Sequence, residues 1–258
     1  MSEKEGAFNN EKIHLIFFLS FFAILVTVLF AIWGFVNTPM GIKYVDIFFL
    51  STEYPTNFAM YFSHFTHESL LGHLLPNLVV FSLVIEGLVM FPLLDYKTGP
   101  EIIPRWYLVS VCLLFVIILP FTISSILLIG TPVWHPEMGH GFSGIICAMI
   151  GLLLVTISYF ISQKLDYLPG FCQPLCIGLS LLFTMIMLLV LIFVDLLLGW
   201  TVFSGPHVVG LLMGTSISWV TGNIYTAKTQ RRKLVWVGIL CVIFILPIII
   251  AEPMIVLV

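Results

Sequence analysis

Charged side chains are scarce in this sequence. Lys, Arg, Asp and Glu together make up 9% of its 258 residues, whereas a soluble globular domain carries about 25%. Hydrophobic residues account for 60% of the chain. So few charges cannot cover a surface that faces water, which excludes a soluble enzyme. The net charge of −3 and the absence of a basic stripe also exclude a nucleic-acid-binding protein.

Cysteine is sparse as well, and its five residues are an odd number. Four of them stand in apolar runs, namely Cys112, Cys147, Cys176 and Cys241. This usage is typical of packing residues. It excludes a small secreted domain that is held together by disulfides.

Long apolar runs take the place of charge. A helix needs roughly 20 apolar residues to cross a bilayer, and seven runs are candidates. They cover residues 13–36, 69–94, 106–129, 141–162, 175–198, 205–226 and 234–250. The sequence therefore predicts an all-α polytopic membrane protein with seven spans.

The basic residues predict the orientation of these spans. Nine of the ten lie at the N-terminus or in the second, fourth and sixth loops, and only Lys43 lies on the other side. The nine are Lys4, Lys12, Lys97, Arg105, Lys164, Lys228, Arg231, Arg232 and Lys233. Because Lys and Arg accumulate in cytoplasmic loops, we expect a cytoplasmic N-terminus in a multi-pass protein of the cell membrane.

Four uncharged polar side chains share one depth in three of these runs. They are His73 and Asn77 in the second run, Ser143 in the fourth and His207 in the sixth. Each lies 18 to 22 residues before the first cytoplasmic charge, which is roughly 27–33 Å at 1.5 Å per residue. Polar groups inside a membrane are costly and mark function. We therefore expect a site near the extracytoplasmic face.

Small residues accompany both Ser143 and His207, and they allow membrane helices to approach closely. They are Gly141, Gly144, Ala148 and Gly151 around Ser143, and Gly210 and Gly214 after His207. This packing would bring His207 against the helix of Ser143. A serine beside a base, with donors for an oxyanion, is the set of groups that acyl transfer requires.

The chain resembles the rhomboid intramembrane serine proteases. The resemblance is carried by Gly141-Phe142-Ser143-Gly144, His73-x-x-x-Asn77 and His207-x-x-Gly210-x-x-x-Gly214 on the expected helices. It implies that Ser143 is the nucleophile and His207 the general base. It further implies that His73, Asn77 and the backbone N–H of Ser143 stabilise the oxyanion, and that no cofactor or metal takes part. The substrates would be transmembrane proteins, cleaved near the extracytoplasmic face.

The resemblance also divides the chain into three parts. Residues 1–12 would be a cytoplasmic N-terminal segment, 13–226 a rhomboid-like six-helix core, and 227–258 a basic cytoplasmic loop followed by a seventh transmembrane helix. Three features depart from the family pattern. Cys147 replaces an aromatic residue that often stacks on the histidine, Pro76 falls between His73 and Asn77, and the first loop lacks a Trp-Arg pair.

Other readings of the polar residues remain open. A rhomboid-like protein could bind membrane clients without cleaving them, and a transporter could use the intramembrane acids Glu86 or Asp195. We expect Glu86 to bond across helices and Asp195 to lie near the outer end of its helix.

The remaining histidines are not expected to act in the chemistry, although His135 and His140 lie just before the serine and could line the water entry. His67 and His73 are six residues apart, a helical rotation of about 240° that would point their rings apart, so we predict no metal site. His64, His67, His135 and His140 are interpreted as interface or loop residues.

Overall fold

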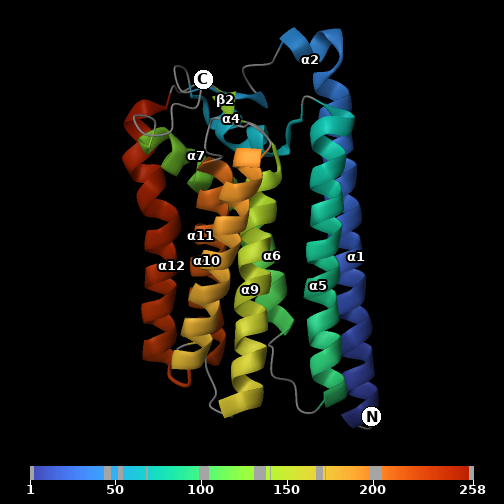
Figure 1. Cartoon of the computed structure of the whole chain (residues 1–258), viewed down its shortest axis with the longest axis vertical. Coiled ribbons are helices and arrows are strands. Elements are labelled where there is room, and N and C mark those ends of the chain that lie inside the picture. The colour runs from blue at the N-terminus through green and yellow to red at the C-terminus, as the bar shows by residue number, and fades with distance from the viewer. Residues whose placement is uncertain are drawn as a thin grey trace.

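The computed structural model describes residues 3–43, 48–51, 55–67, 69–98, 105–130, 138–139, 141–166, 171, 173–197 and 205–255. Long helices run side by side along the longest axis of the molecule (Figure 1). Short helices and a strand pair gather at the end of this bundle where the first long helix ends. The first long helix begins, and the last one ends, at opposite ends of the bundle.

The long helices account for most of the described chain. They are α1 (Glu3–Val36), α5 (Leu75–Thr98), α6 (Arg105–Ile117), α7 (Leu119–Ile129), α9 (Ser143–Asp166), α10 (Pro174–Leu197), α11 (Gly205–Thr226) and α12 (Gln230–Ala251). The shorter elements are α2 (Pro39–Lys43), α4 (Asn57–Phe62), the 3₁₀ turns η1 (Ser63–Phe65) and η3 (Glu252–Met254), and a π-helical turn η2 (Leu70–Leu74). Strands β1 (Leu50–Ser51) and β2 (Met138–Gly139) pair antiparallel, so the segment before α4 adjoins the segment before α9.

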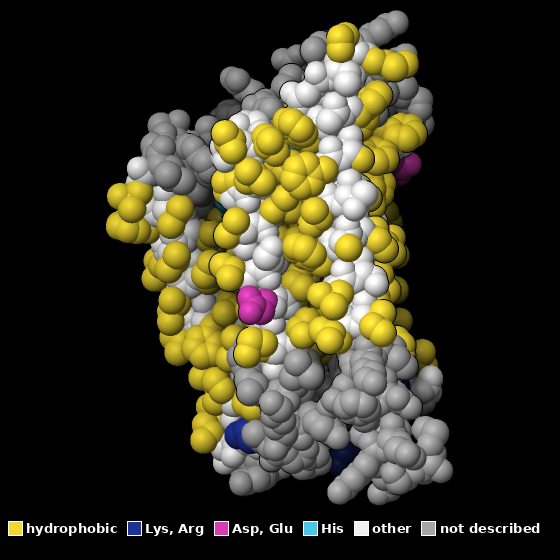
Figure 2. Space-filling model, turned by 90° about the vertical axis from the view of Figure 1, so that its right-hand side faces the viewer, with side chains coloured by type: hydrophobic (Ala, Val, Ile, Leu, Met, Phe, Trp, Pro, Cys, Tyr) yellow, Lys and Arg dark blue, Asp and Glu magenta, His cyan; other side chains and the backbone are white. Residues whose placement is uncertain are grey.

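Five of these helices are long and apolar enough to cross a membrane, and the bent pair α6 and α7 makes a sixth if it counts as one span. This count covers the described residues only. Hydrophobic side chains cover the middle of the face shown in Figure 2. The predicted class, an all-α polytopic membrane protein, is confirmed. The sixth predicted run, residues 205–226, is α11, and it is not in this set because Gly, Ser, Thr and Asn are spread along it and lower its mean hydropathy.

The third predicted run is not one straight helix. It divides at Ile118 into α6 and α7, which are bent by 52° relative to each other. Pro120 lies just after the break and has no N–H to donate to the carbonyl of Val116 one turn earlier. The hydroxyl of Tyr61 in α4 donates to that carbonyl instead, at 3.1 Å. Pro120 therefore accounts for the bend, and the Tyr61 hydroxyl takes the place of the missing donor.

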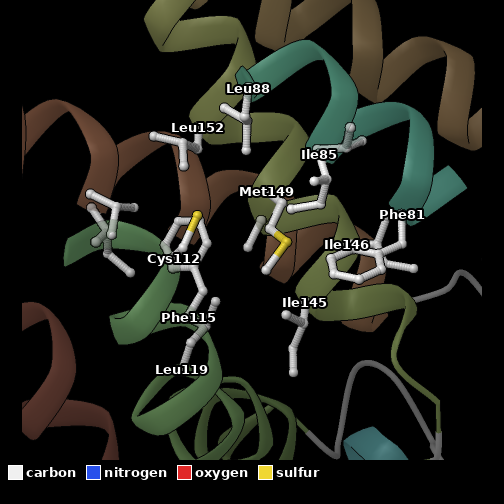
Figure 3. Close-up of a cluster of buried hydrophobic side chains, with 14 of the residues drawn as sticks. Phe81, Ile85, Leu88, Cys112, Phe115, Leu119, Ile145, Ile146, Met149 and Leu152 are labelled. Carbon is white, nitrogen blue, oxygen red and sulfur yellow. The ribbon is translucent and has the colours of Figure 1, made fainter. Parts of the chain in front are cut away.

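The hydrophobic core lies between α5, α6, α7 and α9 (Figure 3). Buried side chains of all four helices meet there. Those labelled in the figure are Phe81, Ile85 and Leu88 of α5, Cys112 and Phe115 of α6, Leu119 of α7, and Ile145, Ile146, Met149 and Leu152 of α9.

Helices α9 and α11 touch along their backbones. A Cβ added to Gly210 would overlap the carbonyl oxygen of Gly144, and one added to Gly214 would overlap that of Ala148. From the other side, a Cβ on Gly151 would lie 2.6 Å from the backbone nitrogen of Thr215. Small residues thus set the spacing of this helix pair over two turns.

Gly214→Ala should therefore destabilise the protein. The new methyl group would meet backbone atoms of Ala148 that cannot move independently, and overpacking of this kind costs about 1–3 kcal/mol. Gly178→Ala in α10 is the matched control, because nothing lies within 4 Å of the added Cβ. Thermal unfolding in detergent measures both changes. Equal melting temperatures for the two variants would contradict the close contact.

Candidate active site at the start of α9

Ser143 is the first residue of α9 and is half-buried. The helix starts there because the carbonyl of Phe142 accepts the first helical hydrogen bond, from the N–H of Ile146 at 3.1 Å. The first N–H groups of a helix have no partner inside it and carry a partial positive charge. The start of α9 therefore presents backbone donors beside the Ser143 hydroxyl.

Gly141 gives the chain its sharp entry into α9. Its φ is +116°, a conformation that side-chain-bearing residues rarely adopt. Its N–H donates to the carbonyl of Ser63 at 2.8 Å, which ties the entry to the η1 turn. A Cβ at this position would stand 2.8 Å from the Cε1 and Nε2 atoms of His73. The missing side chain leaves room for the His73 imidazole directly beside the start of α9.

Asn77 is linked to the start of α9 through His67, a residue for which the sequence predicted no role in the site. Its Nδ2 donates to Nε2 of His67 at 3.0 Å, and the backbone N–H of Phe142 donates to the same nitrogen at 3.4 Å. His67 is fully buried. One imidazole nitrogen thus links the first turn of α5 to the residue immediately before Ser143.

The expectation that His67 and His73 point apart is wrong. Their rings lie edge to face, with centroids 4.8 Å apart and planes at 71°. The expectation assumed one continuous helix, but His67 precedes the helical turn, which begins only after Ser69. The hydroxyl of Ser69 caps that turn by accepting the N–H of Gly72 at 3.0 Å. Pro76 is the second residue of α5, but η2 continues into α5 without a break, so this proline lies inside a helical stretch that begins at Leu70.

His207 is the third residue of α11 and is half-buried, like Ser143. The residue before it, Pro206, contacts the residue after Ser143. A Cβ on Gly144 would lie 3.2 Å from the Pro206 carbonyl oxygen. The first turns of α9 and α11 therefore adjoin, with Ser143 on one helix and His207 on the other. Cys147 is buried one turn further along α9.

Another serine and histidine, Ser124 and His64, form a buried pair between α7 and η1. Nε2 of His64 is 3.0 Å from Oγ of Ser124, and that hydroxyl donates to the carbonyl of Met60 at 2.7 Å. His64 is 4% exposed and Ser124 is 0% exposed, so a substrate cannot reach them. His64 lies in the short turn η1 and His67 in the non-helical segment after it, so both are outside the long helices as expected, but both are buried. The pair of His64 and Ser124 anchors the segment before α5 on α7.

Burial also changes the acidity of His64. It lowers the pKa of the imidazole from its ordinary value of 6.5 to about 4, because the charged form loses its hydration. A hydrogen bond with the backbone of Pro120 acts in the opposite direction and offsets part of this effect.

Several sequence interpretations fall outside the described residues. These are His135, His140 and the side chain of Asp195. Within the described part of the chain, no group of three or more His, Cys, Asp or Glu side chains could hold a metal ion. Glu86 was expected to bond across helices, but its side chain is exposed on α5. Among the described residues it has no hydrogen bond or ion pair, so that expectation is wrong.

No family model, no curated protein and no solved structure matches this chain. The arrangement of its own side chains is therefore the basis for a functional conclusion.

The buried His64 should make stability depend on pH. The unfolded chain takes up a proton on this residue below about pH 6.5, whereas the folded chain does so only near pH 4. The free energy of unfolding should therefore fall as the pH drops from 6.5 to 4, by about 3 kcal/mol in total. His64→Gln keeps an N–H donor for Ser124 but cannot titrate, so its melting temperature should fall less over this interval. Identical pH dependence in both proteins would contradict a buried, neutral His64.

Proposed function

We propose that this chain is a rhomboid-type intramembrane serine endopeptidase that cleaves transmembrane segments of other proteins. One observation carries the proposal. The start of α9 gathers Ser143, His73 and the pair of Asn77 and His67 at one point, and the first turn of α11, which bears His207, packs against it. A nucleophile, a base and donors for an oxyanion are the groups that peptide hydrolysis needs.

The reaction would proceed in two steps. His207 takes the proton from the Ser143 hydroxyl as Oγ attacks the scissile carbonyl carbon, and it returns that proton to the leaving amine. An acyl-enzyme remains on Ser143. Water then attacks the acyl carbon, gives a proton to His207, and releases the new carboxyl group as the proton returns to Ser143. No metal or cofactor enters either step.

The negative oxygen of the tetrahedral intermediate would be held by the donors around Ser143. The backbone N–H groups at the start of α9, the His73 ring and the Asn77 amide are the candidates. An amide nitrogen has two hydrogens, and one of those on Asn77 is directed to His67. The other hydrogen remains for the oxyanion. His67 would thus be a positioning residue, because it acts on the reaction through Asn77.

The membrane arrangement that we propose keeps all seven predicted spans. Helix α11 packs against α9, α12, α10, α6 and α7, so its polar residues can face other helices, although its composition alone does not mark it as a span. The start of α1 and the end of α12 lie at opposite ends of the bundle (Figure 1), which supports an odd number of crossings. The distribution of Lys and Arg supports a cytoplasmic N-terminus. The site would then face the extracytoplasmic side of a cell membrane.

Substrates would be single-span or other transmembrane proteins. A helix keeps its peptide groups in internal hydrogen bonds, so a segment must unwind locally before its carbonyl reaches Ser143. We therefore expect cleavage where small or helix-breaking residues lie near the outer interface. The transporter alternative loses one of its two candidate acids, because Glu86 is exposed on α5 rather than buried inside the bundle.

Ser143→Ala and His207→Ala should each abolish cleavage of a single-span reporter in reconstituted vesicles. The first removes the attacking oxygen and the second removes its base, and loss of either group costs several orders of magnitude in kcat. Labelling by a serine-reactive fluorophosphonate should disappear in Ser143→Ala. The readouts are the amount of cleaved reporter and the fluorescence of the labelled band.

Ser124→Ala is the matched control, because it removes a hydroxyl that contacts a different histidine, His64. This variant should still be labelled. Labelling that disappears with Ser124 and persists without Ser143 would disprove the assigned nucleophile. Correctly folded wild-type protein that is neither labelled nor able to cleave any reporter would favour the non-catalytic client-binding alternative.

His67→Ala should lower kcat about tenfold with little change in KM. Loss of an oxyanion donor costs about 10²–10³ in kcat, and His67 holds the Asn77 donor rather than donating itself. The double variant His67→Ala/Asn77→Ala should be no slower than Asn77→Ala alone, because both changes disable the same donor. Steady-state kinetics of all four proteins test this. Fully additive losses in kcat would mean that His67 acts on the fold rather than through Asn77.

A further inference from the structure

A small hydrophobic cluster lies apart from the main core, among the short elements at one end of the bundle. We call it the outer core. Its members are Leu50 of β1, Ala59 and Met60 of α4, Phe121 and Leu128 of α7, and Ile255, which follows η3. Phe121 and Ile255 are partly buried, and the others are buried. Segments that are far apart in the sequence therefore meet in one place.

The segment that leads into Ser143 is attached to elements of this outer core. Gly139 pairs with Leu50 between β2 and β1. The N–H of Gly141 donates to the carbonyl of Ser63 at 2.8 Å, and Ser63 directly follows α4. Both attachments thus depend on elements that pack in the outer core. A shift of that core would be transmitted through them to the start of α9.

Helix α12 brings Ile255 to the outer core. Along this helix only Phe244 and Ala251 are buried, and Ala251 is its last residue. The turn η3 follows, and the N–H of Ile255 donates to the carbonyl of Glu252 at 3.1 Å. Figure 1 shows that α12 ends at the same end of the bundle as α4 and β2. The buried end of α12 and the turn after it therefore direct Ile255 onto the outer core.

The strand pair depends on this packing for its position. Only two residue pairs join β1 to β2, namely Leu50 with Gly139 and Ser51 with Met138. A two-stranded sheet is at best marginally stable without side chains that pack against it. Removal of apolar atoms from a packed cluster leaves a cavity that the neighbouring side chains fill only in part. Loss of the Ile255 side chain should therefore loosen Leu50 and the strand that it anchors.

We propose that Ile255 is a positioning residue for Ser143. Its side chain keeps the outer core packed, and the outer core fixes the two attachments of the segment before α9. The end of α12 would thus act on the nucleophile through β1, α4 and β2. The kinetic consequence of this contact rests on the proposed protease function, whereas the contact itself does not depend on catalysis.

Ile255→Ala should lower kcat for cleavage of a single-span reporter about tenfold with little change in KM, because a small misplacement of the nucleophile is sufficient for such a loss. Labelling of Ser143 by the fluorophosphonate should slow as well. Ile255→Leu preserves the volume of the side chain and should restore most of kcat. Met254→Ala is the matched control, since Met254 is the preceding residue and is 43% exposed. It should keep the wild-type kcat.

A cross-linking measurement tests the contact without catalysis. Ser51→Cys and Met138→Cys place two thiols on opposite residues of the strand pair. The Cα atoms of such residues lie about 4.5–5.5 Å apart, a separation that a disulfide can span. Added Ile255→Ala should slow the oxidative cross-linking several-fold, and the completed cross-link should restore kcat to this variant. Ser51→Cys alone controls for cross-links to the native cysteines.

Phe244→Leu separates this effect from a general loss of stability. Phe244 belongs to α12 but packs in the main core, so its substitution should lower the melting temperature and leave the cross-linking rate unchanged. Equal cross-linking rates with and without Ile255→Ala would overturn the proposal, as would a wild-type kcat in Ile255→Ala. If the wild-type protein cleaves no reporter but cross-links faster than Ile255→Ala, the protease function fails and the contact of Ile255 is upheld.

Discussion

The backbone contact between α9 and α11 is the constraint on which the rest of the molecule depends. Side chains normally keep helix axes apart, but Gly144, Gly210 and Gly214 leave nothing between these two backbones. The helices that begin with Ser143 and with the Pro206-His207 pair therefore start side by side. Loops could hold such groups only loosely, whereas two packed helices determine their spacing. These small residues therefore determine the positions of the two helix starts on which the proposed chemistry depends.

The second part of the site is built on a different principle. Helices α9 and α11 are in backbone contact because glycines leave no side chains between them. The segment that bears His73 and Asn77 instead contacts α9 through the buried imidazole of His67. His67 accepts hydrogen bonds from Asn77 and from the backbone of Phe142. It therefore connects the start of α5 to the start of α9. Gly141 completes the contact by leaving room for His73. Ser143 therefore lies between a close helix–helix contact on one side and a hydrogen-bonded, buried histidine on the other.

Most of the helical architecture could be read from the sequence, because apolar runs of bilayer length have few other uses. The positions of Ser143, His73 and Asn77 near one another were also predictable, since helix rise converts residue spacing into depth. Three features were not. The break at Ile118 depends on whether Pro120 finds a substitute donor for the Val116 carbonyl, and that donor comes from Tyr61, 55 positions away. The burial of His64 and the role of His67 depend on a non-helical path before Ser69, which periodicity does not reveal. The exposure of Glu86 depends on which side of α5 faces the bundle.

The hydrogen bond from Tyr61 to the Val116 carbonyl makes the bend between α6 and α7 depend on a distant part of the chain. Pro120 removes the local donor, and the hydroxyl that replaces it stands 55 positions before Val116. A substitution in α4 can therefore act on the break in a helix pair that follows it by some fifty residues, and Tyr61→Phe would leave the Val116 carbonyl without this hydrogen bond.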